Sequence, residues 1–374
     1  MRRTGRRHWW HAGRAGLAVV ALAAPVWAAP GVAAVADDEH QRLAFSEVDL
    51  VSNIPGRAAV TDDRVENAWG LALSPTSPLW VANNGTNTAT LYAGGLGGAP
   101  PTVVNLVVTI PGGAPTGQVF NGTSGFVVTG PGGSGPARFL FVSEDGDLTG
   151  WSPAAVPPVN GKSAAVVAAH VDGAIYKGLA LATTAFGTVL LAADFHNGRI
   201  DVFDSSFNLI QPGAPFFTDP GLPAGYAPFN VAVLDGKVYV AYAKQDADAE
   251  DEVAGAGFGF VDVYNGFGLL ERRLVSNGPL NAPWGLEIAP ASFGKFAGDL
   301  LVGNFGDGRI TAVDLGSGHV DGQLRDMRGR PIAIDGLWAL LRGTASTGGT
   351  GAVWFSAGPN EEADGLVGQI RPGG

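Results

Sequence analysis

Six short apolar runs in the sequence end at comparable positions, and most of the residues at these positions carry oxygen ligands. The six residues are Asn83, Glu144, Asp194, Tyr242, Asn304 and Ala357. A hard cation such as Ca²⁺ or Mg²⁺ binds carboxylate and amide oxygens, and it can polarise a carbonyl or phosphoryl oxygen or lower the pKa of a water molecule. We predict a metal site formed by Glu144, Asp194, Asn230 and Asn304. In the other interpretation, the Asn and Asp residues only begin hairpin turns, which suit their side chains.

A histidine lies beside this predicted site. His196 follows Asp194 by two positions and precedes the turn sequence Asn197-Gly198. The pKa of a histidine side chain lies near neutral pH, so His196 is the candidate general base for a hydrolytic reaction. The simpler interpretation is a surface histidine in a hairpin turn.

Aromatic residues precede four of the segments that recur along the chain. They are Trp69, Tyr176, Phe229 and Trp284. Together with Asn83 they could line a ligand pocket that combines apolar walls with a few polar groups. Alternatively, they pack between neighbouring sheets, and the sequence favours this packing role.

The elements that position these residues follow from an internal repeat. A glycine followed by apolar, variable and apolar residues recurs at intervals of 51 to 55 residues. The segments begin at Gly70, Gly125, Gly178, Asn230, Gly285 and Gly336, with asparagine replacing glycine in the fourth. Each is followed by a second apolar run, and third runs show apolar and polar residues in alternation, which predicts β-strands joined by hairpins. Six such units predict an all-β fold, a six-bladed β-propeller with four-stranded blades.

The two ends of the repeat array predict how the ring closes. The last unit has only three strands before it ends at Arg371, whereas Val48 to Asn53 resembles Arg272 to Asn277, the connection between the fourth and fifth units. We therefore expect the N-terminal strand to complete the last blade, because this removes an exposed strand edge. A single propeller domain is predicted at residues 43–372, after a short N-terminal segment at 37–42.

Charge and cysteine content exclude several kinds of function. The chain has a net charge of −11 and no cysteine, which excludes disulfides, thiolate catalysis and cysteine-bound metals. An acidic protein does not neutralise phosphates, so nucleic acid is not an expected partner. The acidic stretch from Asp246 to Glu252 is expected to be a solvated loop. We expect a monomer without a membrane span, because no second long apolar stretch follows the first 36 residues.

The first 36 residues have the pattern of an export signal. Five arginines precede an apolar run from Ala15 to Ala29, and the small residues from Ala34 to Ala36 offer a cleavage site. The order Arg6-Arg7-His8-Trp9-Trp10 also fits a twin-arginine signal, so the Sec and twin-arginine routes both stay open. The expected product is secreted and acidic, with 18 basic and 34 acidic residues after removal of the signal.

The chain from Leu50 to Gln369 resembles a family of uncharacterised, exported bacterial six-bladed propellers. The resemblance rests on Leu50-Val51-Ser52-Asn53, Asn67-Ala68-Trp69-Gly70-Leu71, Ala193 to Val202, Pro283-Trp284-Gly285-Leu286 and Gly303 to Gly308. It implies the fold and export but assigns no catalytic residue.

The predicted architecture is also similar to that of NHL-repeat proteins and of gluconolactonase and calcium-dependent phosphotriesterase-like enzymes. Those enzymes hold one divalent cation on the channel axis with Glu, Asn and Asp side chains. By this resemblance, the four predicted ligands would hold such an ion here. The blade sequences do not otherwise match, so the likeness concerns the fold alone.

Two functions are compatible with these features. The first is a secreted propeller that binds a small ligand at the mouth of its central channel, with a divalent cation as an optional part of the site, and that could hydrolyse a lactone or an ester. The second is a non-catalytic module that recognises an extracellular protein or a cell-envelope glycan through its loops. The sequence leaves open whether the chain is an enzyme.

Overall fold

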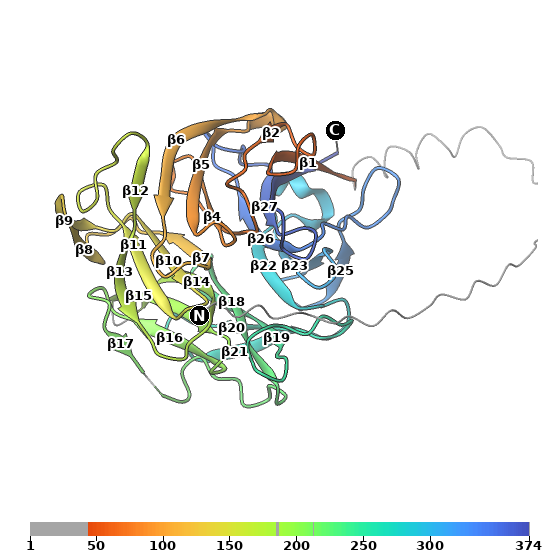
Figure 1. Ribbon diagram of the computed structural model, residues 1–374. Helices are drawn as coiled ribbons and strands as arrows, with labels where there is room; N and C mark the ends of the chain where they lie inside the picture. The colour runs from red at the N-terminus through yellow and green to blue at the C-terminus, as the bar shows by residue number, and fades with distance from the viewer. Residues whose placement is uncertain (1–43, 185–186, 212, 374) are drawn as a thin grey trace, which may run out of the picture. The chain divides into compact units, whose positions relative to one another are not determined.

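The structure, a computed structural model, describes residues 44–184, 187–211 and 213–373. The predicted export signal at 1–36 and the segment at 37–42 lie outside these residues. Six β-sheets follow one another around a ring (Figure 1). This is the predicted six-bladed β-propeller, and the predicted fold class is therefore confirmed.

Blades 1 to 3 each contain four antiparallel strands, in order from the channel outwards. Blade 1 consists of β3 (Ala68–Ala72), β4 (Leu79–Asn83), β5 (Thr88–Gly94) and β6 (Pro101–Thr109). Blade 2 consists of β7 (Pro115–Phe120), β10 (Phe139–Ser143), β11 (Asp147–Trp151) and β13 (Val166–His170). Blade 3 consists of β14 (Tyr176–Thr184), β15 (Gly187–Asp194), β16 (Arg199–Phe203) and β17 (Leu209–Ile210).

Blades 4 to 6 follow the same plan. Blade 4 consists of β18 (Tyr226–Leu234), β19 (Lys237–Lys244), β20 (Phe260–Tyr264) and β21 (Leu270–Ser276). Blade 5 consists of β22 (Pro283–Ile288), β23 (Leu300–Asn304), β24 (Ile310–Val313) and β25 (Val320–Gln323). Blade 6 consists of β26 (Leu337–Arg342), β27 (Val353–Ala357), β28 (Leu366–Pro372) and β1 (Phe45–Ser52).

The remaining elements are short additions to the blades. Two strands add parallel edges, β2 (Val60–Thr61) to β1 and β12 (Lys162–Ala164) to β6. A separate hairpin is formed by β8 (Val127–Gly130) and β9 (Gly133–Pro136). The 3₁₀ helices are η1 (Leu96–Gly98) and η2 (Ala291–Phe296).

The N-terminal strand closes the ring. Strand β1 pairs antiparallel with β28, with Asp49 opposite Gly368 and Ser52 opposite Leu366. The prediction that the N-terminal strand completes the last blade is thus confirmed. The first strands of the blades contact one another in the order β3, β7, β14, β18, β22 and β26, and β26 contacts β3 again. These six strands therefore surround the central axis.

Blade 2 departs from the predicted repeat. We predicted that Gly125 to Val128 begins its first strand, but β7 takes that place and Val127 begins the separate hairpin β8–β9. The hairpin is inserted between the first and second strands of the blade, and the even spacing was fortuitous here. The true first strand has Gln118 after Gly117, where the other units have an apolar residue, so the apolar pattern does not reveal it.

The glycine of the repeat is required because neighbouring first strands lie very close together. A Cβ atom on Gly70 would lie 2.3 Å from the carbonyl oxygen of Thr116. A Cβ atom on Gly117 would lie 2.4 Å from the amide nitrogen of Leu179. No side chain fits at these distances, so only glycine allows the backbones to approach in this way.

Each first strand contains a register irregularity near its start, at the same end of the channel. The irregularities follow Ala68, Pro115, Tyr176, Pro228, Pro283 and Leu337. A β-bulge changes the direction in which the next side chain points. The next residues are Trp69, Thr116, Lys177, Phe229, Trp284 and Trp338.

Candidate functional site

Aromatic side chains that follow these bulges meet on the channel axis. Trp338 of blade 6 stacks on Trp69 of blade 1, with 3.6 Å between ring centroids, and on Phe305 at 4.0 Å. Trp284 of blade 5 packs edge-on against Trp69 at 6.4 Å, and Phe229 of blade 4 lies 5.9 Å from Trp338. Rings from non-adjacent blades can meet only at the axis, so these five side chains close the channel. We call them the aromatic plug.

Lys177 is the only charged residue among the six that follow the bulges. Its side chain is 1% exposed, and Nζ lies 5.4 Å from the centroid of the Trp69 ring. The ammonium group forms ion pairs with Glu144 and, at 3.4 Å, with Asp251. Burial lowers the pKa of Lys177, but the carboxylates of Glu144, Glu252 and Asp251 outweigh this effect and raise the pKa above that of a free lysine.

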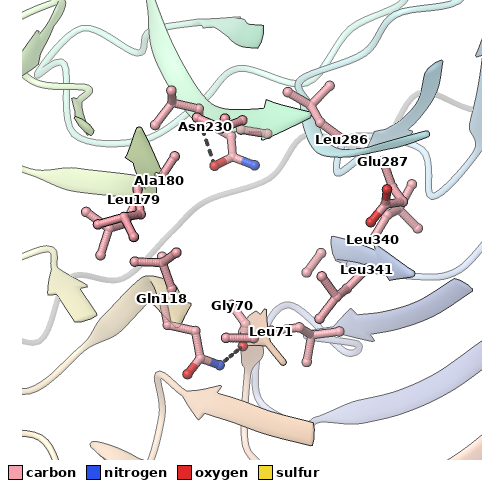
Figure 2. A pocket seen from close by; sticks show the side chains of 18 of the residues that line it. Gly70, Leu71, Gln118, Leu179, Ala180, Asn230, Leu286, Glu287, Leu340 and Leu341 are labelled. Carbon is pink, nitrogen blue, oxygen red and sulfur yellow. Dashed lines mark hydrogen bonds between the residues drawn. The ribbon is translucent and has the colours of Figure 1, made fainter. Parts of the chain in front are cut away.

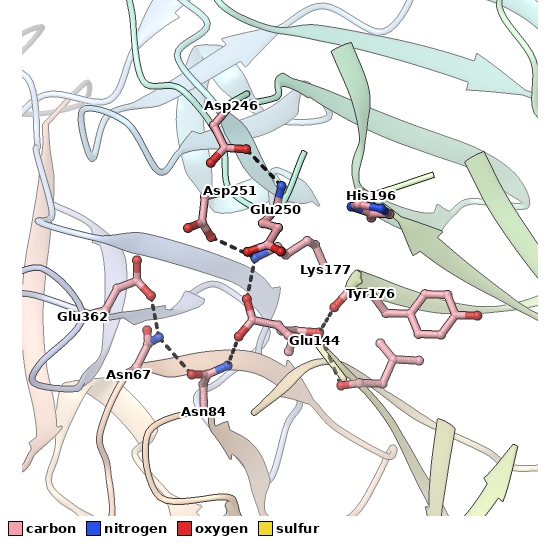
Figure 3. A network of polar contacts seen from close by, with 12 residues as sticks. Asn67, Asn84, Glu144, Tyr176, Lys177, His196, Asp246, Glu250, Asp251 and Glu362 are labelled. Carbon is pink, nitrogen blue, oxygen red and sulfur yellow. Dashed lines mark hydrogen bonds and ion pairs between the residues drawn. The ribbon is translucent and has the colours of Figure 1, made fainter. Parts of the chain in front are cut away.

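Two asparagines connect this ion pair to blades 1 and 6. Asn84 Nδ2 donates a hydrogen bond to Glu144 Oε2 at 3.1 Å. Asn67 Nδ2 donates to Glu362 Oε2 at 2.8 Å, and Asn67 Oδ1 accepts from Trp338 Nε1 at 2.9 Å. The polar layer is therefore attached to the aromatic plug. Figure 3 shows most of the set that we call the mouth network, which consists of Asn67, Asn84, Glu144, Lys177, Asp251, Glu252 and Glu362.

Most of the mouth network comes from loops. Glu144 lies in the turn after β10, Asp251 and Glu252 lie in the long connection between β19 and β20, and Glu362 lies between β27 and β28. Five of the six blades thus contribute to one cluster. The expected solvated loop at Asp246 to Glu252 is corrected here, because its last two residues are half-buried and interact with Lys177.

The carboxyl group of Glu252 has a pKa far above its ordinary value. Burial raises the pKa of Glu252 to about 8, and Lys177 lowers it only in part. This carboxyl group is therefore mostly protonated at neutral pH and can donate a proton. A protonated acid beside an ion-paired carboxylate such as Asp251 is an arrangement that can support general acid–base chemistry.

Two of the predicted metal ligands are engaged in turns. Asp194 Oδ1 accepts hydrogen bonds from the backbone N–H groups of Ile175 at 3.3 Å and Asn197 at 3.2 Å. Asn304 Oδ1 accepts from the backbone N–H of Asn281 at 3.2 Å, and its Nδ2 donates to the carbonyl oxygen of Pro279 at 2.8 Å. These bonds correspond to the turn-forming role that was the other interpretation of the sequence.

The other two predicted metal ligands lie on different sides of the plug. Asn230 lies on β18 and donates to the carbonyl oxygen of Trp284 at 2.7 Å, which joins blades 4 and 5. Glu144 is the first residue of the turn after β10, which ends at Ser143, and from this turn its side chain joins the mouth network. Its predicted place at the end of the strand, opposite Pro115, is occupied by Ser143 instead.

The structure thus brings one of the four predicted metal ligands, Glu144, into the mouth network. Within the described part of the chain, no group of three or more His, Asp or Glu side chains is arranged to hold a metal ion. The metal site stays a prediction.

The predicted ligand-binding residues separate into two groups. Trp69, Phe229 and Trp284 belong to the aromatic plug and are at most 5% exposed. Tyr176 and Asn83 lie inside blades instead. The hydroxyl group of Tyr176 donates to Asp201 Oδ2 at 2.8 Å, and Asn83 Nδ2 donates to Thr90 Oγ1 at 3.0 Å.

His196 lies at the edge of the mouth. Its ring is exposed, and Nδ1 lies 3.2 Å from the carbonyl oxygen of Ala249 in the acidic loop. In Figure 3 it lies apart from the pair formed by Lys177 and Glu144. Its role as a general base stays a prediction.

Lys177, Asn84 and Glu362 were not predicted as site residues from the sequence. A signal for Lys177 was available, because it precedes Gly178 at the position where Trp69 and Trp284 precede the glycine in other units. A lysine at a position that is aromatic in other units indicates that a charged group lies where the other blades have a packed ring. Asn84 and Glu362 lie in loops, and the repeat offers no equivalent positions with which to compare them.

Two proteins of Acanthamoeba polyphaga mimivirus are similar to the chain in sequence. "Uncharacterized protein R648" is 37% identical over 330 residues, which cover 86% of this chain and 78% of that protein. "Uncharacterized protein L690" is 34% identical over 333 residues, which cover 86% of this chain and 84% of that protein. Because these relatives are viral, the bacterial and exported character implied by the sequence resemblance stays a prediction. No family model matches the chain.

Solved structures share the fold at low sequence identity. The PQQ-bound form of an aldose sugar dehydrogenase from Streptomyces coelicolor is 15% identical with a TM-score of 0.50, over 88% of this chain and 98% of that one. A gluconolactonase from Xanthomonas campestris is 12% identical with a TM-score of 0.38, over 62% of this chain and 81% of that one. At 15% identity, the likeness to the dehydrogenase concerns the fold alone, and the TM-score of 0.38 to the gluconolactonase supports no inference. In the described part of the chain, no helix is long and apolar enough to span a membrane.

Proposed function

This chain belongs to the family of the two mimivirus proteins, and we propose that it binds a small polar molecule at the mouth network. The observation that carries the proposal is the convergence of polar side chains from five blades around one buried ammonium group, that of Lys177, directly on the aromatic plug. Binding residues commonly lie on loops that a rigid scaffold positions.

The chemistry of the network favours a ligand that donates hydrogen bonds. Three carboxyl groups, those of Glu144, Asp251 and Glu252, act on a single ammonium group, and carboxylates only accept hydrogen bonds when ionised. The side chains of Glu144 and Asp251 are 29% and 41% exposed, so a ligand can reach them. A molecule rich in hydroxyl or ammonium groups, such as a sugar derivative, fits this set of acceptors.

The proposal extends to hydrolysis of a lactone or an ester. Glu252, whose pKa is raised to about 8 by burial, would donate a proton to the leaving oxygen. Glu144 would accept a proton from the attacking water, and Lys177 would stabilise the negative charge that develops on the carbonyl oxygen.

Ligand binding is tested by thermal unfolding with glucose, glucosamine and glucono-δ-lactone as probes. A bound probe should raise the melting temperature of the wild-type protein, because it binds only the folded state. Glu144→Gln should remove this rise. The matched control is Glu271→Gln, which changes an exposed carboxylate on the outer strand of blade 4. The probe should raise the melting temperature of this variant as it does that of the wild-type protein. Equal responses of both variants would contradict the mouth network as the site.

Hydrolysis is tested with glucono-δ-lactone by continuous titration of the released acid. Loss of the proton donor in Glu252→Gln should lower the rate by about 10²-fold or more. Glu250→Gln, in the same loop, is the control. Binding without hydrolysis in the wild-type protein would limit the proposal to a binding protein.

The predicted Ca²⁺ or Mg²⁺ ion can be tested on the same samples. An ion held by Glu144 would be found by elemental analysis in the wild-type protein and lost in Glu144→Ala. A chelator would then lower the melting temperature of the wild-type protein only. If neither protein contains the ion and the chelator has no effect, the ion is not part of the site.

Export is a further part of the proposal, supported by the pattern of the first 36 residues. N-terminal sequencing of the protein expressed from the full chain should find a start near Asp37 in the secreted fraction. Retention of Met1 in the cells would exclude cleavage of the signal.

A further inference from the structure

The central channel continues on the other side of the aromatic plug as a cavity of about 260 Å³. The first strands of all six blades line it (Figure 2). Aliphatic side chains, among them those of Leu71, Leu179, Leu286 and Leu340, line much of it. Trp284 of the plug also borders the cavity, so the plug separates it from the mouth network.

The cavity is accessible from the end of the channel opposite the mouth network. Near the plug, the lining residues Leu71 and Leu179 are buried, whereas Leu73, Leu181 and Leu341 at the far ends of the same strands are half-buried. Exposure thus increases with distance from the plug. A small molecule can enter there without passing the tryptophans.

Two of the polar side chains that line the cavity are used to join neighbouring blades. Gln118 Nε2 donates to the carbonyl oxygens of Gly70 at 2.6 Å and Trp80 at 2.9 Å. Asn230 Nδ2 donates to the carbonyl oxygen of Trp284 at 2.7 Å. These bonds join blade 2 to blade 1 and blade 4 to blade 5, so both side chains help to close the ring.

Glu287 is the only ionisable residue among the described residues that line the cavity. It is 7% exposed. Its Oε1 accepts from the backbone N–H of Ile288 at 2.8 Å, and its Oε2 accepts from the backbone N–H of Arg342 at 2.7 Å. Two oxygens of a carboxylate can accept about four hydrogen bonds, so capacity remains on both.

The environment of Glu287 does not neutralise its charge. Burial raises the pKa of Glu287, and the backbone N–H groups and the charge of Arg342 oppose this rise without cancelling it, while Asp235 adds to it. A buried carboxyl group in an aliphatic cavity is costly to ionise without a cationic partner. A ligand that brings such a partner would remove this cost.

We infer that the channel beyond the plug is a second ligand site, which takes a small aliphatic ammonium ion. The ammonium group donates hydrogen bonds to Glu287, and the alkyl part contacts the leucines of the inner strands. Apolar side chains with a small number of convergent polar groups are typical of small-molecule sites, and Glu287 is the charged group here. The ligand approaches from the face opposite the mouth network, so this site is independent of the proposed function.

The experiment uses the full chain and three probes of equal shape: cyclohexylammonium, cyclohexanol and cyclohexanecarboxylate. Binding is measured by ligand-observed NMR titration at pH 7. Cyclohexylammonium should bind at least about tenfold more tightly than cyclohexanol, because a charge-assisted hydrogen bond contributes an effect of this size. Cyclohexanecarboxylate should bind most weakly.

Three variants locate the bound amine. Glu287→Gln should reduce cyclohexylammonium binding by about tenfold, and Ala232→Phe, which adds a ring to the half-buried wall of the cavity, should abolish it. Glu271→Gln, which changes an exposed carboxylate on the outer strand of blade 4, should leave it unchanged. Circular dichroism confirms that each variant is folded, and Ala232→Phe keeps Glu287 intact if Glu287→Gln does not fold.

Several results would overturn the inference. These are no binding of cyclohexylammonium, equal binding of all three probes, and binding that survives Ala232→Phe. Amine binding that is lost in Glu144→Gln but kept in Glu287→Gln would place the amine at the mouth network and would likewise exclude the channel site.

Discussion

The two sides of the aromatic plug differ in chemistry although the same six strands approach both. On one side, Lys177 is surrounded by carboxyl groups, most of which come from loops such as those of Asp251 and Glu362. On the other side, Leu179 of the same strand faces a cavity whose lining residues lie on or beside the inner strands. Strands repeated around a ring provide a uniform aliphatic wall, whereas loops that differ between blades provide a polar cluster.

The largest expected effect comes from breaking the plug that separates the two sides. Trp338→Ala removes the stacking contacts with Trp69 and Phe305 and the hydrogen bond to Asn67. It should lower the free energy of unfolding by about 3–5 kcal/mol, as is usual for large buried aromatic residues. Urea unfolding measures this change. Phe267→Ala, at an aromatic residue that is 54% exposed, should change it by less than about 0.5 kcal/mol. Similar losses in both variants would show that the plug does not hold the blades together.

A smaller loss is expected when the charge of the mouth is removed. Lys177→Met keeps much of the side-chain volume but leaves Glu144 and Asp251 without their ammonium partner. We expect a loss of about 2–3 kcal/mol at pH 7, below the range for fully buried pairs because both carboxylates are partly exposed. The control Lys237→Met breaks an exposed pair with Glu271 and should cost less than about 1 kcal/mol. An unchanged or increased stability of Lys177→Met would mean that Lys177 is kept for binding and not for folding.

The mouth should also make stability depend on pH. The pKa of Glu252 is about 8 in the folded chain against an ordinary value of 4.5, so between these values the folded state holds a proton that the unfolded state has released. The contribution of Glu252 to the free energy of unfolding is therefore fully present below the ordinary pKa. It is lost as the pH rises through about 8.

Glu252→Gln, which resembles the protonated form, should therefore flatten the decrease of stability between pH 5 and pH 8 by at most about 1.4 kcal/mol per pH unit. Urea unfolding at a series of pH values measures the slope. Glu250→Gln should keep the slope of the wild-type protein. A steeper decrease in Glu252→Gln would show that the sign is wrong.

The smallest effect is expected at the edge of the mouth. His196 is exposed, and its side chain bonds only the carbonyl oxygen of Ala249 among the contacts described for it. His196→Gln should change the free energy of unfolding by less than about 0.5 kcal/mol and the affinity for a mouth ligand by less than about twofold. A loss of hydrolysis in this variant, with binding unchanged, would instead support His196 as the general base.

Much of the fold could be predicted from the sequence because its causes are local. The glycine of the repeat is required where neighbouring strands approach closely, as at Gly70. Alternation of apolar residues reports which face of a strand is buried. The pairing of β1 with β28 followed from an incomplete last unit and was confirmed. Blade 2 was assigned wrongly because Gln118 replaces an apolar residue and a hairpin mimics the expected spacing.

Less of the candidate site could be predicted. Glu144 was assigned to the mouth, although it stands one residue beyond the strand position predicted for it. Asp194 and Asn304 have the predicted residue types, but their side chains bond the backbone of turns. A residue type at a repeated position does not reveal whether its side chain faces the axis or its own loop.

Apolar periodicity and close backbone approach act within each unit and between neighbouring units. The amino-acid sequence alone therefore predicts six sheets around an axis and the pairing of β1 with β28. Which polar groups meet on each side of the plug depends on the folded arrangement of the blades. The distances between Glu144, Lys177 and Asp251 depend on bulges and loop paths in three different blades. Small backbone rotations at these places move the end of a side chain by several ångströms. The local sequence pattern does not reveal the combined effect of these rotations.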